Sequence, residues 1–291
     1  MPGMETLTRK VKKIPPQHQD QQPGREEEMI PKPIYDNGEK GLGRLKEKVA
    51  VITGGDSGIG RAVAVAFAKE GATVAIVYLN EHEDAKKTSA ELQKYGTKNV
   101  LISTDISIEK NCKKAIEQVV RQFKSIDILV NNAAVQYPQE TLENITAEQL
   151  QRTFGTNIFA QFYLAKYAIP HMKDGSCIIN TASVTAYKGN EQLIDYSSTK
   201  GAIVAFTRSL ATSLAPKGIR VNAVAPGPVW TPLIPASFDR KKVSEFGKDI
   251  LMGRPAQPVE IAPCYVFLAS KESIFITGQT LHPNGGTVVN S

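Results

Sequence analysis

A glycine-rich turn between an apolar strand and a helix is the feature that most constrains how this chain can fold. Residues 53–60 have the sequence Thr-Gly-Gly-Asp-Ser-Gly-Ile-Gly, which follows the apolar run 49–52 and precedes a helical pattern from Arg61 to Glu70. Such a turn presents free backbone N–H groups at the positive end of a helix dipole. Because glycine has no Cβ, a ligand can approach its backbone closely. The turn therefore suits a pyrophosphate group, although a purely structural turn also uses glycine.

Apolar runs alternate with helical patterns from residue 45 onward, as in repeated strand–helix units. Several predicted strands are nearly continuous in apolar residues, which is typical of a parallel sheet covered on both faces. The pattern predicts one α/β domain over residues 44–291, a doubly wound parallel sheet with helices on both faces. Strands are expected at 48–53, 73–79, 99–104, 126–131, 176–181, 219–225 and 276–281, and helices at 58–71, 82–95, 109–124, 146–172, 197–216 and 258–270.

Residues 1–43 differ in composition from the rest of the chain. They contain six prolines, several glutamines and charged runs, with almost no apolar periodicity. Such a segment cannot bury enough apolar surface to form a core of its own. It is either a mobile tail or a proline-rich arm that lies over the domain or a neighbouring subunit, anchored by Met29, Ile34 and Tyr35.

Residues 228–256 also interrupt the strand–helix alternation. Several prolines punctuate this stretch, which contains Trp230, Phe238 and Phe246. Irregular insertions near the carboxyl ends of strands commonly cover a ligand crevice. We expect a lid over the substrate, and the alternative is a surface excursion.

Composition argues against several classes of partner. The formal net charge is +6 over 291 residues, with no dense Lys/Arg cluster of the kind that binds nucleic acid. No apolar run approaches a membrane span, and the N-terminus lacks the apolar stretch of a signal peptide. Cys112, Cys177 and Cys264 lie far apart in apolar segments, which favours core residues over disulfides or metal ligands. We expect a soluble cytoplasmic protein without a metal, a membrane partner or a nucleic-acid partner.

Four polar residues have the chemistry of an active site. Tyr196 and Lys200 lie four residues apart in a helical pattern, so they project from one face. A phenol titrates near ~10 and is a poor acid–base catalyst at neutral pH unless a cation such as Lys200 stabilises its anion. Ser183 follows a predicted strand at the sheet edge where the glycine turn ends, and its hydroxyl can donate to a substrate oxygen. Asn157 is a polar residue among phenylalanines in a long predicted helix.

These motifs together resemble the short-chain dehydrogenase/reductase family, whose fingerprint T-G-x-x-x-G-x-G matches the glycine turn. The resemblance covers the chain from about residue 45, and with the arm it extends to the bacterial general-stress-protein and aldehyde-reductase subgroup, which is glucose-dehydrogenase-like. It implies a Rossmann-like fold. Ala134 replaces the usual glycine, and His282-Pro283-Asn284 replaces the usual Val-Asp. The matching motifs, in order, are Thr53 to Gly60, Asp105, Asn131-Asn132-Ala133, Asn157, Ser183, Tyr196 with Lys200, Pro226-Gly227 with Thr231, and Thr277-Gly278-Gln279 with Gly285-Gly286.

The resemblance implies a catalytic role for each of the four polar residues. Tyr196 is expected to be the general acid/base, and Lys200 to lower its pKa and hold the nicotinamide ribose. Ser183 is expected to orient the substrate carbonyl, and Asn157 to hold a proton-relay water. Hydride would pass between the nicotinamide and a carbonyl or alcohol substrate such as an aldehyde, a ketone or a sugar.

The resemblance also implies the cofactor contacts. Asp105 is expected at the adenine, Asn131 at the adenosine ribose, and the segment from Pro226 to Thr231 at the nicotinamide carboxamide. The expected cofactor-binding residues are Gly54, Asp56, Ser57, Gly58, Ile59, Gly60, Tyr78, Leu79, Asn80, Asp105, Ile106, Asn131, Ala133, Tyr196, Lys200, Pro226, Gly227, Val229 and Thr231.

The end of the second strand bears on the choice between NAD and NADP. An acidic residue there binds the ribose of NAD, whereas a nearby arginine accommodates the phosphate of NADP. This chain has Tyr78 at the position of the acidic residue and neither arrangement in its usual form. Asp56 lies in the turn and Glu81 follows the strand, so a phosphate would meet negative charge. The sequence favours NAD. NADP is not excluded, because aldehyde reductases of the resembling subgroup can use it and because a backbone shift could bring Arg61 or Lys86 into reach.

Two other classes of function compete with an enzyme. One is a catalytically silent dinucleotide-binding sensor, which usually lacks the tyrosine or the lysine, and the other is a scaffold that uses the arm.

The resemblance further implies a homotetramer in which the helices 146–172 and 197–216 pack against symmetry mates through Phe154, Ile158, Phe162, Tyr163, Val204, Phe206 and Leu210. The substrate pocket is expected to include Gln136, Val184, Leu193 and Trp230.

Overall fold

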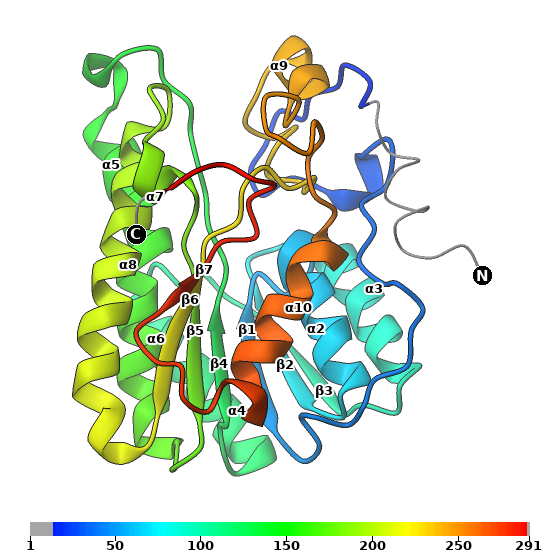
Figure 1. Ribbon diagram of the computed structural model, residues 1–291, viewed down its shortest axis with the longest axis vertical. Helices are drawn as coiled ribbons and strands as arrows, with labels where there is room; N and C mark the ends of the chain where they lie inside the picture. The colour runs from blue at the N-terminus through cyan, green and yellow to red at the C-terminus, as the bar shows by residue number, and fades with distance from the viewer. Residues whose placement is uncertain (1–13, 290–291) are drawn as a thin grey trace.

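The computed structural model describes residues 14–289 and places seven parallel strands in one sheet (Figure 1). The strand order is β3-β2-β1-β4-β5-β6-β7. The predicted doubly wound α/β fold is therefore confirmed. The strands are β1 Val49–Thr53, β2 Thr73–Tyr78, β3 Asn99–Ser103, β4 Ile128–Asn131, β5 Cys177–Thr181, β6 Arg220–Val224 and β7 Thr280–Leu281.

Helices cover both faces of the sheet, because the strands are apolar on both sides. One face packs against α2 Gly58–Lys69, α3 His82–Gln93 and α10 Pro258–Ala269. The opposite face packs against α4 Glu109–Phe123, α6 Ala160–Ala168 and α8 Ile194–Leu214. Figure 1 shows these two layers on either side of the strands.

Strands β2 and β3 lie on one side of β1, and strands β4 to β7 lie on the other side, so the strand order switches between β1 and β4. Strand β1 pairs with β2 on one side and with β4 on the other. Open α/β sheets bind ligands outside the carboxyl ends of the strands at such a switch point. The glycine turn after β1 and the asparagines at the end of β4 lie there.

Several elements differ from their predicted bounds. The predicted helix 146–172 is made of α5 Ala147–Phe154, a π-helical turn Gly155–Phe159, α6 and a 3₁₀ turn Ile169–His171. Helix α8 begins three residues earlier than predicted, and β7 has two residues where six were predicted. The remaining short elements are α7 Thr185–Lys188 and α9 Arg240–Glu245, with 3₁₀ turns Glu26–Glu28, Leu142–Asn144, Ala215–Lys217 and Lys271–Ser273.

The described part of the N-terminal arm, residues 14–43, packs on the domain. Its first half lies beside the lid segment, residues 228–256, and then runs past α3 (Figure 1). Met29 is fully buried in a cluster with Ile14 and Trp230. The Trp230 Nε1 donates to the Pro31 carbonyl at 2.8 Å. Of the two alternatives for this segment, the described residues adopt the ordered arm, and residues 1–13 lie outside the description.

None of the helices over residues 14–289 is both long and apolar enough to cross a membrane. Within the same residues, no three His, Cys, Asp or Glu side chains cluster as metal ligands do. Cys112 and Cys177 are buried, and Cys264 is partly buried.

Candidate active site

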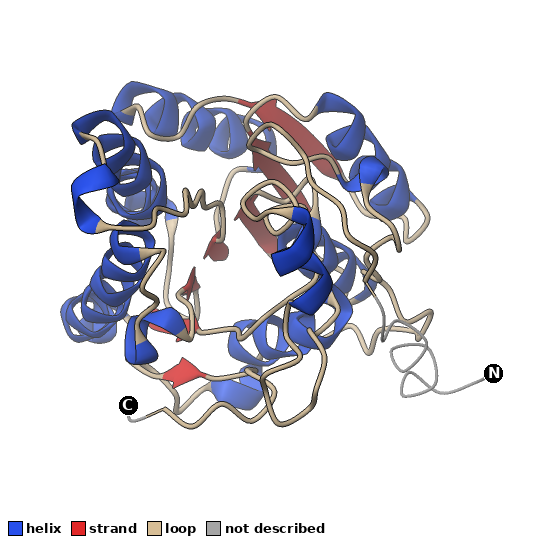
Figure 2. Ribbon diagram, turned by 90° about the horizontal axis from the view of Figure 1, so that it is seen from above, coloured by secondary structure: helices blue, strands red, loops and turns tan. Residues whose placement is uncertain are grey.

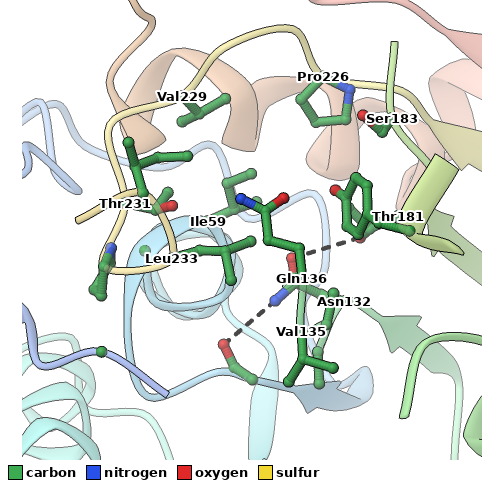
Figure 3. Close-up of a pocket in the computed structure, with 18 of the residues that line it drawn as sticks. Ile59, Asn132, Val135, Gln136, Thr181, Ser183, Pro226, Val229, Thr231 and Leu233 are labelled. Atoms are coloured by element: carbon green, nitrogen blue, oxygen red, sulfur yellow. Dashed lines mark hydrogen bonds between the residues drawn. The ribbon is translucent and has the colours of Figure 1, made fainter. Parts of the chain in front are cut away.

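A cavity of about 460 Å³ opens at the carboxyl ends of the strands. Seen from above, the strands lie end-on inside a ring of helices and loops (Figure 2). Figure 3 shows Ile59, Thr231 and Leu233 on one side of this cleft and Thr181 and Ser183 on the other. The cleft therefore brings together the glycine turn, the ends of β4 and β5, and the lid segment.

Close packing makes glycine necessary in the turn after β1. A Cβ on Gly60 would lie 1.8 Å from the Gly54 carbonyl oxygen, so no larger residue fits. Gly54 has φ +62° and donates from its backbone to Val77 at 2.7 Å. Asn132 holds the turn from the other side, since its Nδ2 donates to the Thr53 carbonyl at 3.0 Å.

The turn fits a dinucleotide. Gly54, Asp56, Ser57, Gly58 and Ile59 line the cleft at the N-terminus of α2, where the helix dipole favours an anion. The Gly58 backbone N already donates to the Glu26 carboxylate at 2.9 Å. Gly60 does not line the cleft and acts through its packing beneath Gly54.

Tyr196 and Lys200 lie together on the cleft wall. Both are buried, at 8% and 1% exposure, and the Lys200 Nζ lies 5.3 Å from the centre of the tyrosine ring. The Nζ donates to the Thr181 carbonyl at 2.8 Å. Burial lowers the pKa of Lys200 to about 7, because the charged amine has left water. Burial raises the pKa of Tyr196 to about 12, and the Ser183 hydroxyl partly opposes this rise.

Ser183 lies two residues beyond the end of β5 and lines the same wall. Its Oγ accepts from the Thr185 backbone N at 3.2 Å and from the Thr185 Oγ1 at 3.1 Å. These two bonds do not use the Ser183 proton, which can donate either to the Tyr196 oxygen or to a substrate oxygen.

Two residues that the sequence analysis did not select fix the start of α8. Asp195 is 2% exposed, and its carboxylate accepts from the Tyr196 backbone N at 2.8 Å and from the Thr153 Oγ1 at 2.7 Å. The Thr199 Oγ1 donates to the Tyr196 carbonyl at 2.6 Å. The sequence signal that could have identified Asp195 is an acidic residue in the first turn of a helix.

Asn157 does not reach the cleft. It is 0% exposed in the π-helical turn, and its Oδ1 accepts from the Val135 backbone N at 2.8 Å. Its Nδ2 donates to the Val135 carbonyl at 2.9 Å and to the Thr199 Oγ1 at 3.2 Å. The side-chain amide of Asn157 clamps the loop after β4, and the expected role of this residue in holding a relay water stays a prediction.

The expected adenosine residues divide into two groups. Tyr78, Leu79, Asp105, Ile106 and Ala133 line the cleft as expected. Asn80 is exposed at the surface and does not line it.

Asn131 lies inside the sheet and not in the cleft. Its Nδ2 donates to the Asn180 Oδ1 of the neighbouring strand at 2.9 Å. The adjacent Asn132 faces the cleft in its place, because successive side chains of a strand point to opposite faces.

Two carboxyl groups that line the cleft, those of Asp56 and Asp105, have shifted pKa values. Burial, with the nearby Glu81 carboxylate, raises the pKa of Asp56 to about 7. Burial alone would raise the pKa of Asp105, but hydrogen bonds from Ser107 and Arg152 hold it below its ordinary value. The Arg152 guanidinium is thereby committed to Asp105, at 2.8 Å.

Pro226, Gly227, Val229 and Thr231, which the resemblance assigns to the nicotinamide carboxamide, all line the cleft. Gly227 packs on Asn284, where an added Cβ would approach the carbonyl oxygen to 2.6 Å. The unusual His-Pro-Asn segment therefore supports this wall.

Gln136, Val184 and Leu193, which were expected in the substrate pocket, line the cleft. The placement of Trp230 in this pocket was wrong, because its side chain is fully buried between the lid segment and the arm and its Nε1 donates to the Pro31 carbonyl of the arm. The lid segment adds Leu233, Ile234 and Phe238 to the lining. Arm residues Pro23 and Gly24 also line the cleft, and no motif indicated them.

Fold and site define a dinucleotide-binding oxidoreductase. A family model described as enoyl-(acyl carrier protein) reductase matches residues 54–288, and the chain belongs to the short-chain dehydrogenase/reductase family. It is 62% identical over 281 residues to YhxC of Bacillus subtilis (strain 168), an uncharacterized oxidoreductase, with 97% of this chain and 98% of the relative covered.

Two further comparisons concern proteins whose descriptions name a cofactor. The chain is 53% identical over 283 residues to NADPH-dependent aldehyde reductase 1, chloroplastic, of Arabidopsis thaliana, with 94% of this chain and 98% of the relative covered. A short-chain dehydrogenase from Burkholderia cenocepacia J2315, solved in complex with NADP, is 30% identical with a TM-score of 0.79. The match covers 84% of this chain and 98% of that one.

Proposed function

We propose that this protein is an NAD-dependent reductase of aldehydes, ketones or sugars, able to oxidise the corresponding alcohols. The observation that carries the proposal is the single wall on which Tyr196, Lys200 and Ser183 meet beside the glycine turn. A bound nicotinamide supplies or accepts the hydride. The protein must then orient the carbonyl and deliver a proton to its oxygen.

Each residue of the wall has one task in this proposal. The Ser183 hydroxyl donates to the carbonyl oxygen and holds it beside Tyr196. The Tyr196 phenol gives its proton to that oxygen as negative charge develops. Lys200, 5.3 Å from the tyrosine ring, stabilises the phenolate that remains when its amine is protonated, which a pKa of about 7 allows near and below neutral pH. Asp195, Thr199 and Asn157 are positioning residues, since they hold the backbone around the tyrosine and the loop after β4.

The cofactor preference follows from charge at the adenosine end of the cleft. Asp56 and Glu81 are its ionisable lining residues beside the end of β2. Arg152 lines the cleft but is paired with Asp105, and Arg61 is buried in ion pairs with Glu26 and Asp84. A 2′-phosphate would meet carboxylates without an arginine to receive it, which favours NAD.

The test is reduction of a panel of aldehydes, ketones and aldoses by the purified protein with NADH and with NADPH. We expect turnover with NADH and at least a tenfold higher kcat/KM for NADH than for NADPH at low salt. A tenfold preference for NADPH would overturn the cofactor assignment. Cofactor binding without turnover on any substrate would instead indicate a dinucleotide-binding sensor.

We also infer a homotetramer built through the helices α5, α6 and α8. Ile158, Val204 and Phe206, expected at this interface, are buried in the sheet core, which leaves a smaller apolar face. Leu150, Phe159 and Phe162 remain 44%, 46% and 51% exposed. A closed symmetric assembly would bury them.

A further inference from the structure

The N-terminal arm reaches into the cleft at a tight loop from Gln19 to Arg25. The Gln19 side chain closes this loop, since its Nε2 donates to the Arg25 carbonyl at 2.8 Å and its Oε1 accepts from the Arg25 backbone N at 2.7 Å. Gln19 is only 7% exposed, so both bonds are shielded from water. The tip of the loop, Gln22–Gly24, is thereby held in one shape.

The tip is fastened to the loop that follows β4. The Gln22 Nε2 donates to the Gln136 carbonyl at 2.5 Å, and the Gln136 backbone N donates to the Gln22 Oε1 at 3.2 Å. Because the Gln22 amide both donates to and accepts from the Gln136 backbone, the two hydrogen bonds fix the position and the orientation of the arm tip. Gln136 itself lines the substrate end of the cleft.

The loop is also fastened to the lid segment. The Gln19 backbone N donates to the Pro235 carbonyl at 2.8 Å. A Cβ on Gly24 would lie 2.5 Å from the Pro232 carbonyl oxygen and 2.9 Å from the Ala236 Cβ, so the arm backbone touches the lid backbone. Pro23 lies between these two attachments and lines the cavity together with Leu233 and Phe238.

We propose that the arm tip is the substrate-selecting wall of the cleft, and that Pro23 sets the size of the carbonyl substituent that the cleft admits. The family model begins at residue 54, so this wall lies outside the common domain. A rigid ring side chain at the tip excludes bulky substituents, because the tip is fixed on two sides and cannot retreat. This inference rests on the proposed carbonyl chemistry of the same site.

The test compares a small aldehyde, propanal, with a bulky one, cyclohexanecarboxaldehyde. Removing ring atoms in Pro23→Ala is expected to raise the ratio of kcat/KM for the bulky over the small aldehyde about tenfold, and Pro23→Leu is expected to lower it. One methylene group in such a pocket is worth about 10- to 200-fold in discrimination. General loosening of the arm would not move the two variants in opposite directions. Pro16→Ala, an exposed arm proline outside the cleft, is the matched control and should leave the ratio unchanged.

Binding of unreactive amides separates this inference from the proposed function. The dissociation constants of propanamide and cyclohexanecarboxamide, measured with NADH present, should show the same change in ratio without any turnover. Absence of aldehyde reduction by the unaltered protein would overturn the proposed function alone. The arm wall is overturned if Pro23→Ala leaves the amide ratio within twofold of the unaltered protein, or if neither amide binds.

Discussion

Burial governs the proton chemistry of Tyr196. Its phenol is held in the protonated form by a pKa near 12, which suits a proton donor to a carbonyl oxygen. We expect Tyr196→Phe to lower kcat by at least about 100-fold, because general acid catalysis is typically worth 10²–10⁴-fold. The dissociation constant for NADH should stay within a few-fold, measured by fluorescence titration. A variant that keeps more than about a hundredth of the kcat would show that another group supplies the proton.

Lys200 is kept in an environment that disfavours its charge. Burial lowers its pKa from the ordinary 10.5 to about 7, so unfolding takes up a proton between pH 7 and pH 10.5. The folded protein therefore gains stability as the pH rises through this window. We expect Lys200→Met to raise the free energy of unfolding of the cofactor-free protein by on the order of 2 kcal/mol at pH 7, and to abolish turnover.

The pH dependence provides the control for this prediction. The stability difference between Lys200→Met and the unaltered protein should shrink toward pH 10, measured by urea denaturation at each pH. A difference that does not change with pH would mean that packing, and not charge, separates the two proteins.

Asp56 brings pH dependence to the cofactor preference. Its carboxyl has a pKa raised to about 7, so it is largely neutral at pH 6 and charged at pH 8. We expect Asp56→Asn to raise kcat/KM for NADPH about tenfold at pH 8 and much less at pH 6, with little change for NADH. The asparagine should also stabilise the folded state somewhat more at pH 8 than at pH 6, because a carboxyl whose pKa is raised in the folded state costs stability that grows with pH from the unfolded pKa up to about 7. Equal effects at both pH values would contradict this role of the charge.

Individual site residues were predictable where the role follows from the end of an element. Ser183 and the Tyr196–Lys200 pair lie at a strand end and on one helix face, and spacing alone brings them together. The side chains of Asn131 and Asn157 do not line the cleft, and the sequence could not indicate this because both are asparagines within elements, where one residue of rotation decides between cleft and core. The partner that settles each case, Asn180 or Val135, is set by tertiary packing and not by local pattern.

At the level of elements, the strands that are covered on both faces were the most predictable. Apolar runs such as those of β1 and β5 can be interpreted only as buried strands. Strand β7 lies at the sheet edge and pairs through only two residues, so its bounds were predicted poorly. The π-helical turn inside the predicted helix 146–172 has no signal in apolar spacing. The docked arm was one of two alternatives left open by the sequence, with Met29 as an expected anchor that is indeed buried, whereas its hydrogen bonds through glutamine side chains and backbone carbonyls had no signal in the local pattern.

The arm is joined to the cofactor half by a buried ionic cluster. The Glu26 carboxylate contacts the Arg61 guanidinium, accepts from the Gly58 backbone N at 2.9 Å, and lies beside Asp84. We expect Glu26→Ala to lower the free energy of unfolding by about 3–5 kcal/mol, since it leaves a buried guanidinium short of a partner. The KM for NADH should rise as well, because the glycine turn loses an anchor.

Glu28→Ala serves as the control for the arm, because Glu28 is exposed and its ion pair with Arg25 is at the surface. Surface pairs are worth about 0–1 kcal/mol. Denaturant unfolding curves that place the two variants within 1 kcal/mol of each other would contradict a structural role for the buried cluster.

At the scale of the whole molecule, the exposed phenylalanines of the α5–α6 face decide the assembly. We expect Phe162→Glu to convert the tetramer to smaller species, because a charge at a buried symmetric contact meets its own copy. Light scattering of the purified protein at micromolar concentration measures the change. Gln93→Glu on α3, on the opposite face of the sheet, should leave the mass unaltered. If the unaltered protein is a monomer in this measurement, the proposed homotetramer is wrong.

The contacts between arm and lid also impose an order on events during synthesis. The partners of the arm are very distant in the chain: Pro31 meets Trp230, and His18 meets Phe238 across 220 residues. The arm is translated long before the lid surface on which its tip docks. The glycine turn, its strands and the contact between Glu26 and Arg61 can form first, so the nascent protein acquires its nucleotide half before its substrate wall. A chain whose synthesis stops before residue 230 therefore has the glycine turn but lacks the lid segment on which the arm tip docks.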